Sequence, residues 1–268
     1  MTQTGFFPLP GEHITFEKPK HTEWTIIAQL SQQNRQNEEI DVQDGYRPSY
    51  ALATFRVRSD LDGQDAYMRV YLQVPHKGTD FFPPNKRAKQ AAAGYHREVE
   101  AMKAFHEQGS TITPALLAIQ EDIQDKQGVI PGGYVVHIVF QRVPGARLAD
   151  NTTVPGYEPT LHNFFQVFST PERDQIRMVF DKEYRELRKL GWLPSFPWAT
   201  NLIWDSDASK LRVFLIAGSR DEDVVDNGEE KEEVEEKEMP MCDIWGFWGL
   251  AIAPKNRKDR ADLSKWKL

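Results

Sequence analysis

The chain has few of the features that build extracellular or membrane-spanning proteins. Its 268 residues include a single cysteine, Cys242. One cysteine excludes an internal disulfide framework and is typical of a reducing compartment. No stretch stays apolar for the roughly 18 residues that a transmembrane helix needs, and residues 1–8 lack the basic-then-apolar order of a secretory signal. We therefore expect a cytoplasmic or nuclear protein with no membrane partner.

Metal-ligand spacing is missing as well. The chain has seven histidines, and none of them pairs with another or with Cys242 at the spacing of a zinc site. Cys242 has no surrounding signature of a nucleophile, so we interpret it as a structural thiol. No metal is expected from these residues.

Charge is concentrated in one segment. Residues 221–238 contain 11 acidic and 2 basic residues and carry −9, whereas the net charge of the whole chain is −7. The rest of the chain is nearly neutral. It lacks the clustered basic residues of a nucleic-acid footprint, so no nucleic-acid partner is expected.

The first 109 residues predict an irregular start followed by a hairpin and a helix. Residues 1–47 are rich in turn formers and polar side chains, and we expect them to be irregular. Two runs of β-branched and aromatic residues, 50–57 and 66–74, flank an Asp/Gly-rich turn and predict a hairpin. Apolar residues at spacings of three and four predict a helix over 86–108, ended by Gly109.

The remaining segments predict more strands and a second long helix. We expect strands over 114–120, 133–142, 201–204 and 211–216, and a helix over 171–190 that is capped by Thr170 and ended by Gly191. The acidic run follows, then an aromatic segment, 244–250, and a basic tail, 255–267. The tail has three possible roles: folding back onto the acidic run, binding a partner, or keeping the chain end in solution, which is the default expectation.

Four segments resemble a known family. They are 66–75, 97–102, 141–148, and 187–194 together with 201–205. In order and spacing they resemble a degenerate, pseudokinase-type member of the fungal protein-kinase-like and aminoglycoside-phosphotransferase-like proteins. The resemblance implies an α+β, protein-kinase-like two-lobed fold, with an antiparallel N-lobe sheet and helix and a reduced helical C-lobe. The implied parts are an irregular segment (1–47), an N-lobe-like part (48–143), a C-lobe-like part (144–220), an acidic low-complexity linker (221–240), and the aromatic segment with the basic tail (241–268).

The same resemblance implies an interlobe cleft with three candidate binding residues. Arg69 stands where the family has a phosphate-contacting lysine, and an arginine is a wider, planar fork. The resemblance implies that its ion-pair partner is Glu98, or Glu100 if the register slips. Asn201 matches the metal-binding asparagine. The alternative reading is that Arg69 and the glutamates are ordinary surface or interlobe charges.

The parts that phosphoryl transfer needs are missing. The glycines nearest upstream of the second hairpin strand are Gly45 and Gly63, and they form no paired-glycine loop to cover phosphates. Phe196 stands five residues before Asn201, where the family has its catalytic aspartate, and 215–219 contains no carboxylate to hold magnesium. The leading hypothesis is a catalytically degenerate kinase-like protein that binds a small-molecule ligand or a protein partner and needs no cofactor.

Two enzymatic alternatives stay open. An atypical small-molecule phosphotransferase would use Asp205, Asp207 or Asp221 as displaced metal ligands, with ATP and magnesium. A metal-dependent prenyl-diphosphate lyase would use the short acidic pattern of Glu222, Asp223 and Asp226.

Overall fold

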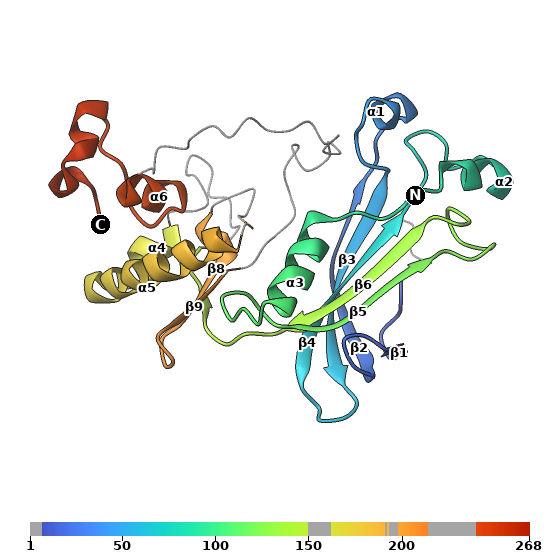
Figure 1. Ribbon diagram of the computed structural model, residues 1–268, viewed down its shortest axis with the longest axis horizontal. Coiled ribbons are helices and arrows are strands. Elements are labelled where there is room, and N and C mark those ends of the chain that lie inside the picture. Colours follow the sequence, from blue (N-terminus) through green and yellow to red (C-terminus); the bar gives the residue numbers. More distant parts are fainter. Residues whose placement is uncertain (1–6, 150–161, 191, 193–197, 214–239) are drawn as a thin grey trace. The chain divides into compact units, whose positions relative to one another are not determined.

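The computed structural model describes residues 7–149, 162–190, 192, 198–213 and 240–268. The chain divides into two compact units (Figure 1). The first unit holds the described residues up to Glu107 and those of 115–142; the second holds 108–114 and the described residues from Val143 onward. The protein is a mixed α/β chain with an antiparallel sheet and several helices.

A six-stranded antiparallel sheet forms the body of the first unit. Its strand order is β1-β2-β3-β4-β6-β5. The strands are β1 (His13–Phe16), β2 (Thr22–Arg35), β3 (Tyr50–Ser59), β4 (Asp65–Gln73), β5 (Leu116–Ile123) and β6 (Tyr134–Gln141). The predicted hairpin is confirmed as β3–β4, in which Arg58 lies opposite Asp65. The turn between the two strands contains Gly63 at φ +71°, a conformation that glycine adopts without strain.

The sheet curls until its two edges approach each other. The Ile119 N–H on β5 donates to the Lys18 carbonyl, just after β1, at 2.9 Å. One face of the curled sheet buries a continuous apolar cluster, because alternate residues of each strand point to that face. The cluster comprises Phe16, Trp24, Ile26, Ala53, Phe55, Val57, Ala66, Met68, Val70, Ala118 and Val139.

The expectation of an irregular segment over residues 1–47 is wrong for its described part. This part contains β1, β2 and the short helix α1 (Glu39–Gln43). Residues 29–34 of β2 are exposed on both faces, so they show none of the apolar alternation by which strands are recognised. Their strand conformation comes from pairing with β3, where Gln33 lies opposite Leu52.

The helix predicted over 86–108 is interrupted. It consists of α2 (Pro84–Arg87), the 3₁₀ turn η1 (Ala88–Gln90), a non-helical segment and α3 (Arg97–Glu107). The buried Gln73 side chain accepts from the Ala92 N–H at 3.1 Å and donates to the Gln90 carbonyl, so the backbone groups there bond to β4 instead of to a helix. Gly94 lies so near Tyr134 that a Cβ would come within 2.8 Å of the ring. The predicted stop is confirmed at Gly109, with φ +64°.

The second unit combines a small sheet with helices. Its three-stranded antiparallel sheet has the order β7-β8-β9. The strands are β7 (Ala146–Arg147), β8 (Leu202–Asp205) and β9 (Lys210–Val213); the helices are α4 (His162–Val167), α5 (Thr170–Lys189), α6 (Met241–Phe247), and the 3₁₀ turns η2 (Ala199–Asn201), η4 (Arg257–Ala261) and η5 (Leu263–Lys265). The strands predicted over 201–204 and 211–216 correspond to β8 and β9, and residues 214–216 lie outside the described residues.

The predicted long helix is confirmed as α5, with a different cap. Its N-cap is Ser169, which forms a capping box with Glu172, so Thr170 is already helical. Its apolar stripe buries Ile176, Phe180 and Leu187. The predicted stop, Gly191, lies outside the described residues.

The basic tail packs on the second unit, which corrects the expectation of a merely solubilising end. Trp266 is buried, and its Nε1–H donates to the Arg260 carbonyl at 3.0 Å. Arg173 on α5 donates to the Leu268 carbonyl at 3.2 Å. The tail therefore follows a defined path, whereas the acidic run of 221–238 lies outside the described residues.

Candidate functional site

A buried arginine–glutamate pair links β4 to α3 in the first unit. The Arg69 guanidinium donates to one oxygen of the Glu98 carboxylate, and the Tyr71 hydroxyl donates to the other. The Arg69 side chain is 11% exposed and the Glu98 side chain is 5% exposed. Further hydrogen bonds offset the cost of burying such a pair. Tyr71 satisfies the second carboxylate oxygen, whereas the Arg69 Nε is buried with no hydrogen-bond partner among the described residues.

Strand alternation places Arg69 and Tyr71, and the start of a helix places Glu98. Residues 69 and 71 share one face of β4, while Met68 and Val70 point into the apolar cluster on the other face. Glu98 lies in the first turn of α3, where the helix dipole favours a negative charge. We call Arg69, Tyr71 and Glu98 the buried triad.

The buried triad is electrically neutral as a whole. Burial lowers the pKa of Arg69, but the Glu98 charge and hydrogen bond outweigh burial, and the pKa is raised overall. Burial, together with the nearby Glu98 charge, raises the pKa of Tyr71 well above its usual value, so its hydroxyl stays a donor at neutral pH. One cation, one anion and one phenol thus share a site from which water is largely excluded.

A buried histidine packs against the triad. The His96 ring stacks on Tyr71 with centroids 4.1 Å apart, and it meets Tyr50 and Tyr134 edge-on at 4.9 and 5.4 Å. Burial, with a smaller contribution from Arg47, lowers the pKa of His96 to about 3. The imidazole is therefore neutral throughout the physiological range.

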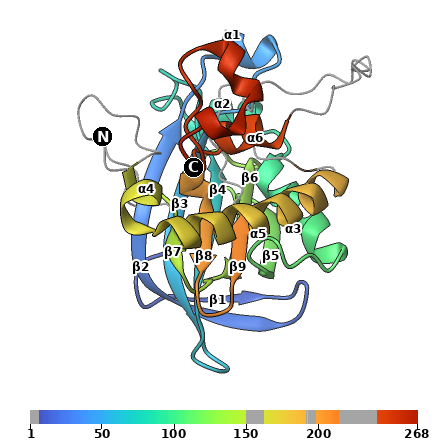
Figure 2. The same cartoon turned by 90° about the vertical axis from the view of Figure 1, so that its left-hand side faces the viewer.

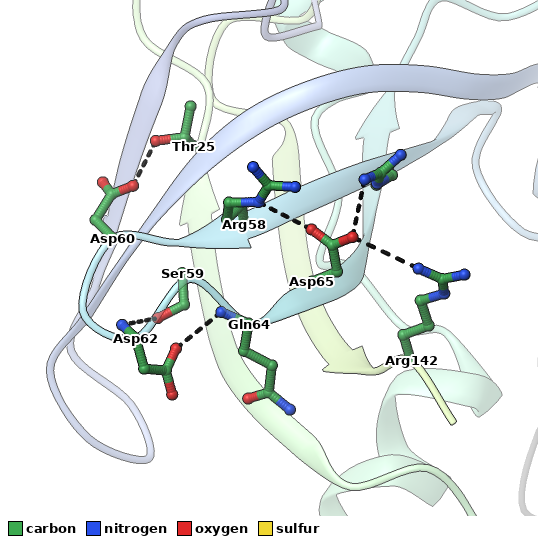
Figure 3. Close-up of polar contacts among 9 residues, drawn as sticks. Thr25, Arg58, Ser59, Asp60, Asp62, Gln64, Asp65 and Arg142 are labelled. Carbon is green, nitrogen blue, oxygen red and sulfur yellow. Dashed lines mark hydrogen bonds and ion pairs between the residues drawn. The ribbon is translucent and has the colours of Figure 1, made fainter. Parts of the chain in front are cut away.

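Three exposed arginines gather around Asp65 at the start of β4 (Figure 3). Its carboxylate contacts Arg56 at 2.9 Å, Arg58 at 3.0 Å and Arg142 at 3.5 Å. The Arg58 hydrogen bond is the largest cause that lowers the pKa of Asp65; burial opposes it, and the Arg56 charge adds to the lowering. We call these four residues the arginine cluster. Three cations against one anion leave it with a net charge of +2.

The arginine cluster and the buried triad share one face of the sheet. Directly opposite residues on neighbouring antiparallel strands point to the same side. Arg58 lies opposite Asp65, and Arg56 lies opposite Tyr67, which is two residues from Arg69 on β4. Positive charge is therefore gathered at the exposed hairpin end of this face, and the neutral buried triad lies farther along the same face.

The structure brings together two of the three predicted binding residues. Arg69 and Glu98 meet in the first unit, and Glu100 instead pairs with Lys103 at 3.0 Å. The alternative reading as surface charges is wrong for Arg69 and Glu98, because both side chains are buried. Asn201 belongs to the second unit, where it is buried at the end of η2 and its N–H donates to the Trp198 carbonyl at 2.8 Å.

The carboxylates of the two enzymatic alternatives gain no support from the structure. Asp205 accepts from the Ala208 N–H at 3.2 Å and so caps the β8–β9 turn. Asp207 is exposed in the same turn. Asp221, Glu222, Asp223 and Asp226 lie outside the described residues. Among the residues that the structure describes, no three His, Cys, Asp or Glu side chains come together as a metal site.

Comparison with known proteins adds no family. No family model matches the sequence, and no curated protein matches it either. Within the described ranges, none of the helices combines the length and apolar character required to cross a bilayer.

Sequence reasoning missed several residues of this face. Tyr71 carries a usable signal, because it follows Arg69 by two positions on a predicted strand. His96 was hidden inside the helix predicted over 86–108. The arginine cluster combines residues of β3 and β4 with Arg142, which follows the end of β6. Arg142 joins the cluster only through the pairing of β4 with β6, in which Ala66 lies opposite Gln141.

Proposed function

We propose that this chain is a catalytically degenerate kinase-like protein whose first unit is a ligand- or partner-binding module. The observation that carries the proposal is the buried Arg69–Glu98 pair. The family resemblance implies a basic residue on this strand paired with an acid on the following helix. A buried ion pair is often no more stabilising than apolar residues of the same volume, so a role in binding accounts for its presence better than stability does.

The chemistry of the sequence supports binding without transfer. Phosphoryl transfer depends on metal-held charge compensation and on a positioned base. Phe196 and the segment 215–219 offer no carboxylate for either task. A bound nucleotide or other phosphate compound would then remain intact.

The charge of the arginine cluster favours a small anionic ligand over an uncharged ligand or a protein partner. Arg56, Arg58 and Arg142 are partly exposed and have one carboxylate to share among them. Planar guanidinium groups match phosphate and carboxylate geometry with two parallel hydrogen bonds. The arginine cluster is therefore the part of this face that is accessible to an anion from solution.

Calorimetric titration with ATP, ADP and pyrophosphate, each with and without magnesium, tests the proposal. We expect binding that does not require magnesium, and no phosphate transfer to water or to any added acceptor. In Arg56→Gln, we expect the Kd to rise about tenfold, which corresponds to about 1.4 kcal/mol for one lost charge-assisted contact. Lys77→Gln is the matched control, because Lys77 is an exposed cation of the same unit that pairs with Glu38 instead of with Asp65.

Two results would overturn the proposal. Magnesium-dependent binding together with phosphate transfer would show an active phosphotransferase, the first enzymatic alternative. The second result is the absence of a specific anion site. It would be seen as failure of all three anions to bind, or as an equal rise of the Kd in Arg56→Gln and in the Lys77→Gln control.

A further inference from the structure

The outer edge of β2 is open along the second half of the strand. β1 pairs only with Thr22–Thr25, and the preceding Gly11 and Glu12 reach Ile26. From residue 27 to residue 34, no described backbone group bonds to β2 on the side away from β3. Figure 2 shows β2 running along the edge of the sheet, with β1 beside its lower end alone. Unpaired N–H and C=O groups in such a row can pair with another strand.

The features that usually protect an open edge are few here. Residues 24–34 contain no charged residue and no proline, and charges and prolines are common protective devices at strand edges. Two bulges interrupt the register between Ile26 and Ser31. Beyond them, Ser31–Arg35 pairs with five consecutive residues of β3 without interruption, so the outermost stretch is a regular strand.

The opposite edge of the same sheet is protected. β5 carries Glu121 and Asp122 near its end, and its N-terminal half is bridged by Lys18. The charge and the bridge both hinder strand addition there. Within the described part of the sheet, the two edges therefore differ in both charge and coverage.

We propose that the open edge of β2 pairs with the same edge of a second copy of this chain, in an antiparallel dimer. A twofold axis places this edge against an identical edge, so an edge that carries charges of one sign would repel itself. The β2 edge avoids this, because its exposed residues Gln29, Gln32 and Gln33 carry amides that both donate and accept hydrogen bonds.

A specific register illustrates the fit. An axis beside Gln32 places Ser31 opposite Gln33 of the second copy and Leu30 opposite Asn34. Arg35 then lies opposite Gln29 instead of opposite another arginine. Leu30 is 53% exposed, and burying it in the dimer adds an apolar contribution.

The interface is small, and this sets the expected affinity. One pair of strands buries less surface than the interfaces of permanent dimers. We therefore expect a reversible dimer in the micromolar range, detectable by sedimentation velocity over a concentration series of the full chain.

Two glutamine substitutions provide a matched test. Gln32→Lys places two lysines next to the axis, and we expect the dimer Kd to rise at least about tenfold, since like charges in direct opposition are unfavourable. Gln64→Lys makes the same change at an exposed position of the β3–β4 turn and is expected to leave the Kd unchanged. Hydrogen exchange supplies the second measurement. The amides of 27–34 that point away from β3 become protected at high concentration only if this edge pairs, whereas those that bond to β3 are protected in the monomer as well.

Each remaining outcome contradicts the proposal. A chain that stays monomeric at all concentrations has no such dimer. Equal weakening by Gln64→Lys, or a dimer in which the outward-pointing amides of 27–34 stay unprotected, places the interface elsewhere. Protection of these outward-pointing amides in the monomer at low concentration would mean that another segment of the same chain covers the edge.

Discussion

Two groups of arginines and carboxylates contact β4, only four residues apart on the same face of the strand. At Arg69 the pair is buried, and one carboxylate meets one guanidinium and one phenol. At Asp65 one carboxylate meets three guanidinium groups whose side chains are 40%, 48% and 54% exposed. Both groups consist of guanidinium and carboxylate groups, but water reaches the group around Asp65 and is largely excluded from the pair at Arg69.

The comparison shows how burial changes what an ion pair does. Water and salt screen the exposed group, so each of its contacts can be lost at small cost. In the buried triad, no water replaces a missing partner, and the loss of one member leaves a charge stranded. Each member of the buried triad therefore depends on the others, while the exposed group stays available to a ligand.

Removing Glu98 is the strongest test of this difference. Glu98→Ala leaves the Arg69 guanidinium buried without its carboxylate. We expect the free energy of unfolding of the first unit to fall by about 3–5 kcal/mol, the usual cost of breaking a buried pair from one side. Denaturant-dependent hydrogen exchange of β4 amides measures this unit separately from the second.

A double variant separates stranded charge from lost packing. Arg69→Met combined with Glu98→Leu removes both charges and keeps apolar volume, and we expect it to recover most of the stability lost in Glu98→Ala. A double variant as unstable as the single one would mean that the pair itself stabilises the unit, contrary to the comparison.

The pairing of Arg69 with Glu98 shows how far sequence reasoning reaches. Strand alternation is a local property, so the sequence carries the position of Arg69 on its strand, and the family resemblance implied Glu98 or Glu100 as its partner. The place of Glu98 in a helical first turn was not predicted, because the helix was expected over 86–108 and α3 begins only at Arg97. The hairpin β3–β4 and helix α5 were predicted because their patterns are strong and continuous.

Features that depend on contacts between residues far apart in the sequence could not be predicted from it. Local apolar spacing predicts a helix across residues 91–96, and the Gln73 side chain, about twenty residues earlier, redirects that backbone. Gln29–Asn34 appeared irregular because exposure on both faces leaves no alternation. The position of Arg142 beside Asp65 depends on strand order, which no local pattern encodes.

The pH dependence of the free energy of unfolding is the next effect in size, and it comes from the buried His96. His96 keeps a pKa of about 3 in the folded chain, against 6.5 when unfolded. Below pH 6.5 the unfolded chain binds a proton that the folded chain does not, so stability decreases as the pH falls. The expected slope is about 1.4 kcal/mol per pH unit, reached below the unfolded pKa. Buried His137, with a pKa lowered to about 4, adds to it.

Two histidine variants test whether His96 causes this pH dependence. His96→Gln should reduce the pH dependence of unfolding between pH 6.5 and 4.5, whereas His106→Gln, at an exposed position of α3, should leave it unchanged. The arginine cluster contributes nothing in this window, because the pKa of Asp65 lies below 3.8 and its stabilisation is lost only as the pH falls through that lower value. An unchanged slope in His96→Gln would contradict the assignment.

The smallest expected effect concerns Asp65 itself. Asp65→Asn removes the one anion among three arginines, so the variant gains repulsion between guanidinium groups that water partly screens. We expect a decrease in stability that is smaller than that of Glu98→Ala and that shrinks as salt rises, because the Debye length falls from about 10 Å at 0.1 M to about 3 Å at 1 M. Asp62→Asn in the same turn is the control, since Asp62 bonds to the Gln64 N–H and to no arginine in the described structure. Equal loss at both salt concentrations would show that Asp65 acts through fixed hydrogen bonds, and the contrast between an exposed, screened group and a buried, unscreened one would then fail.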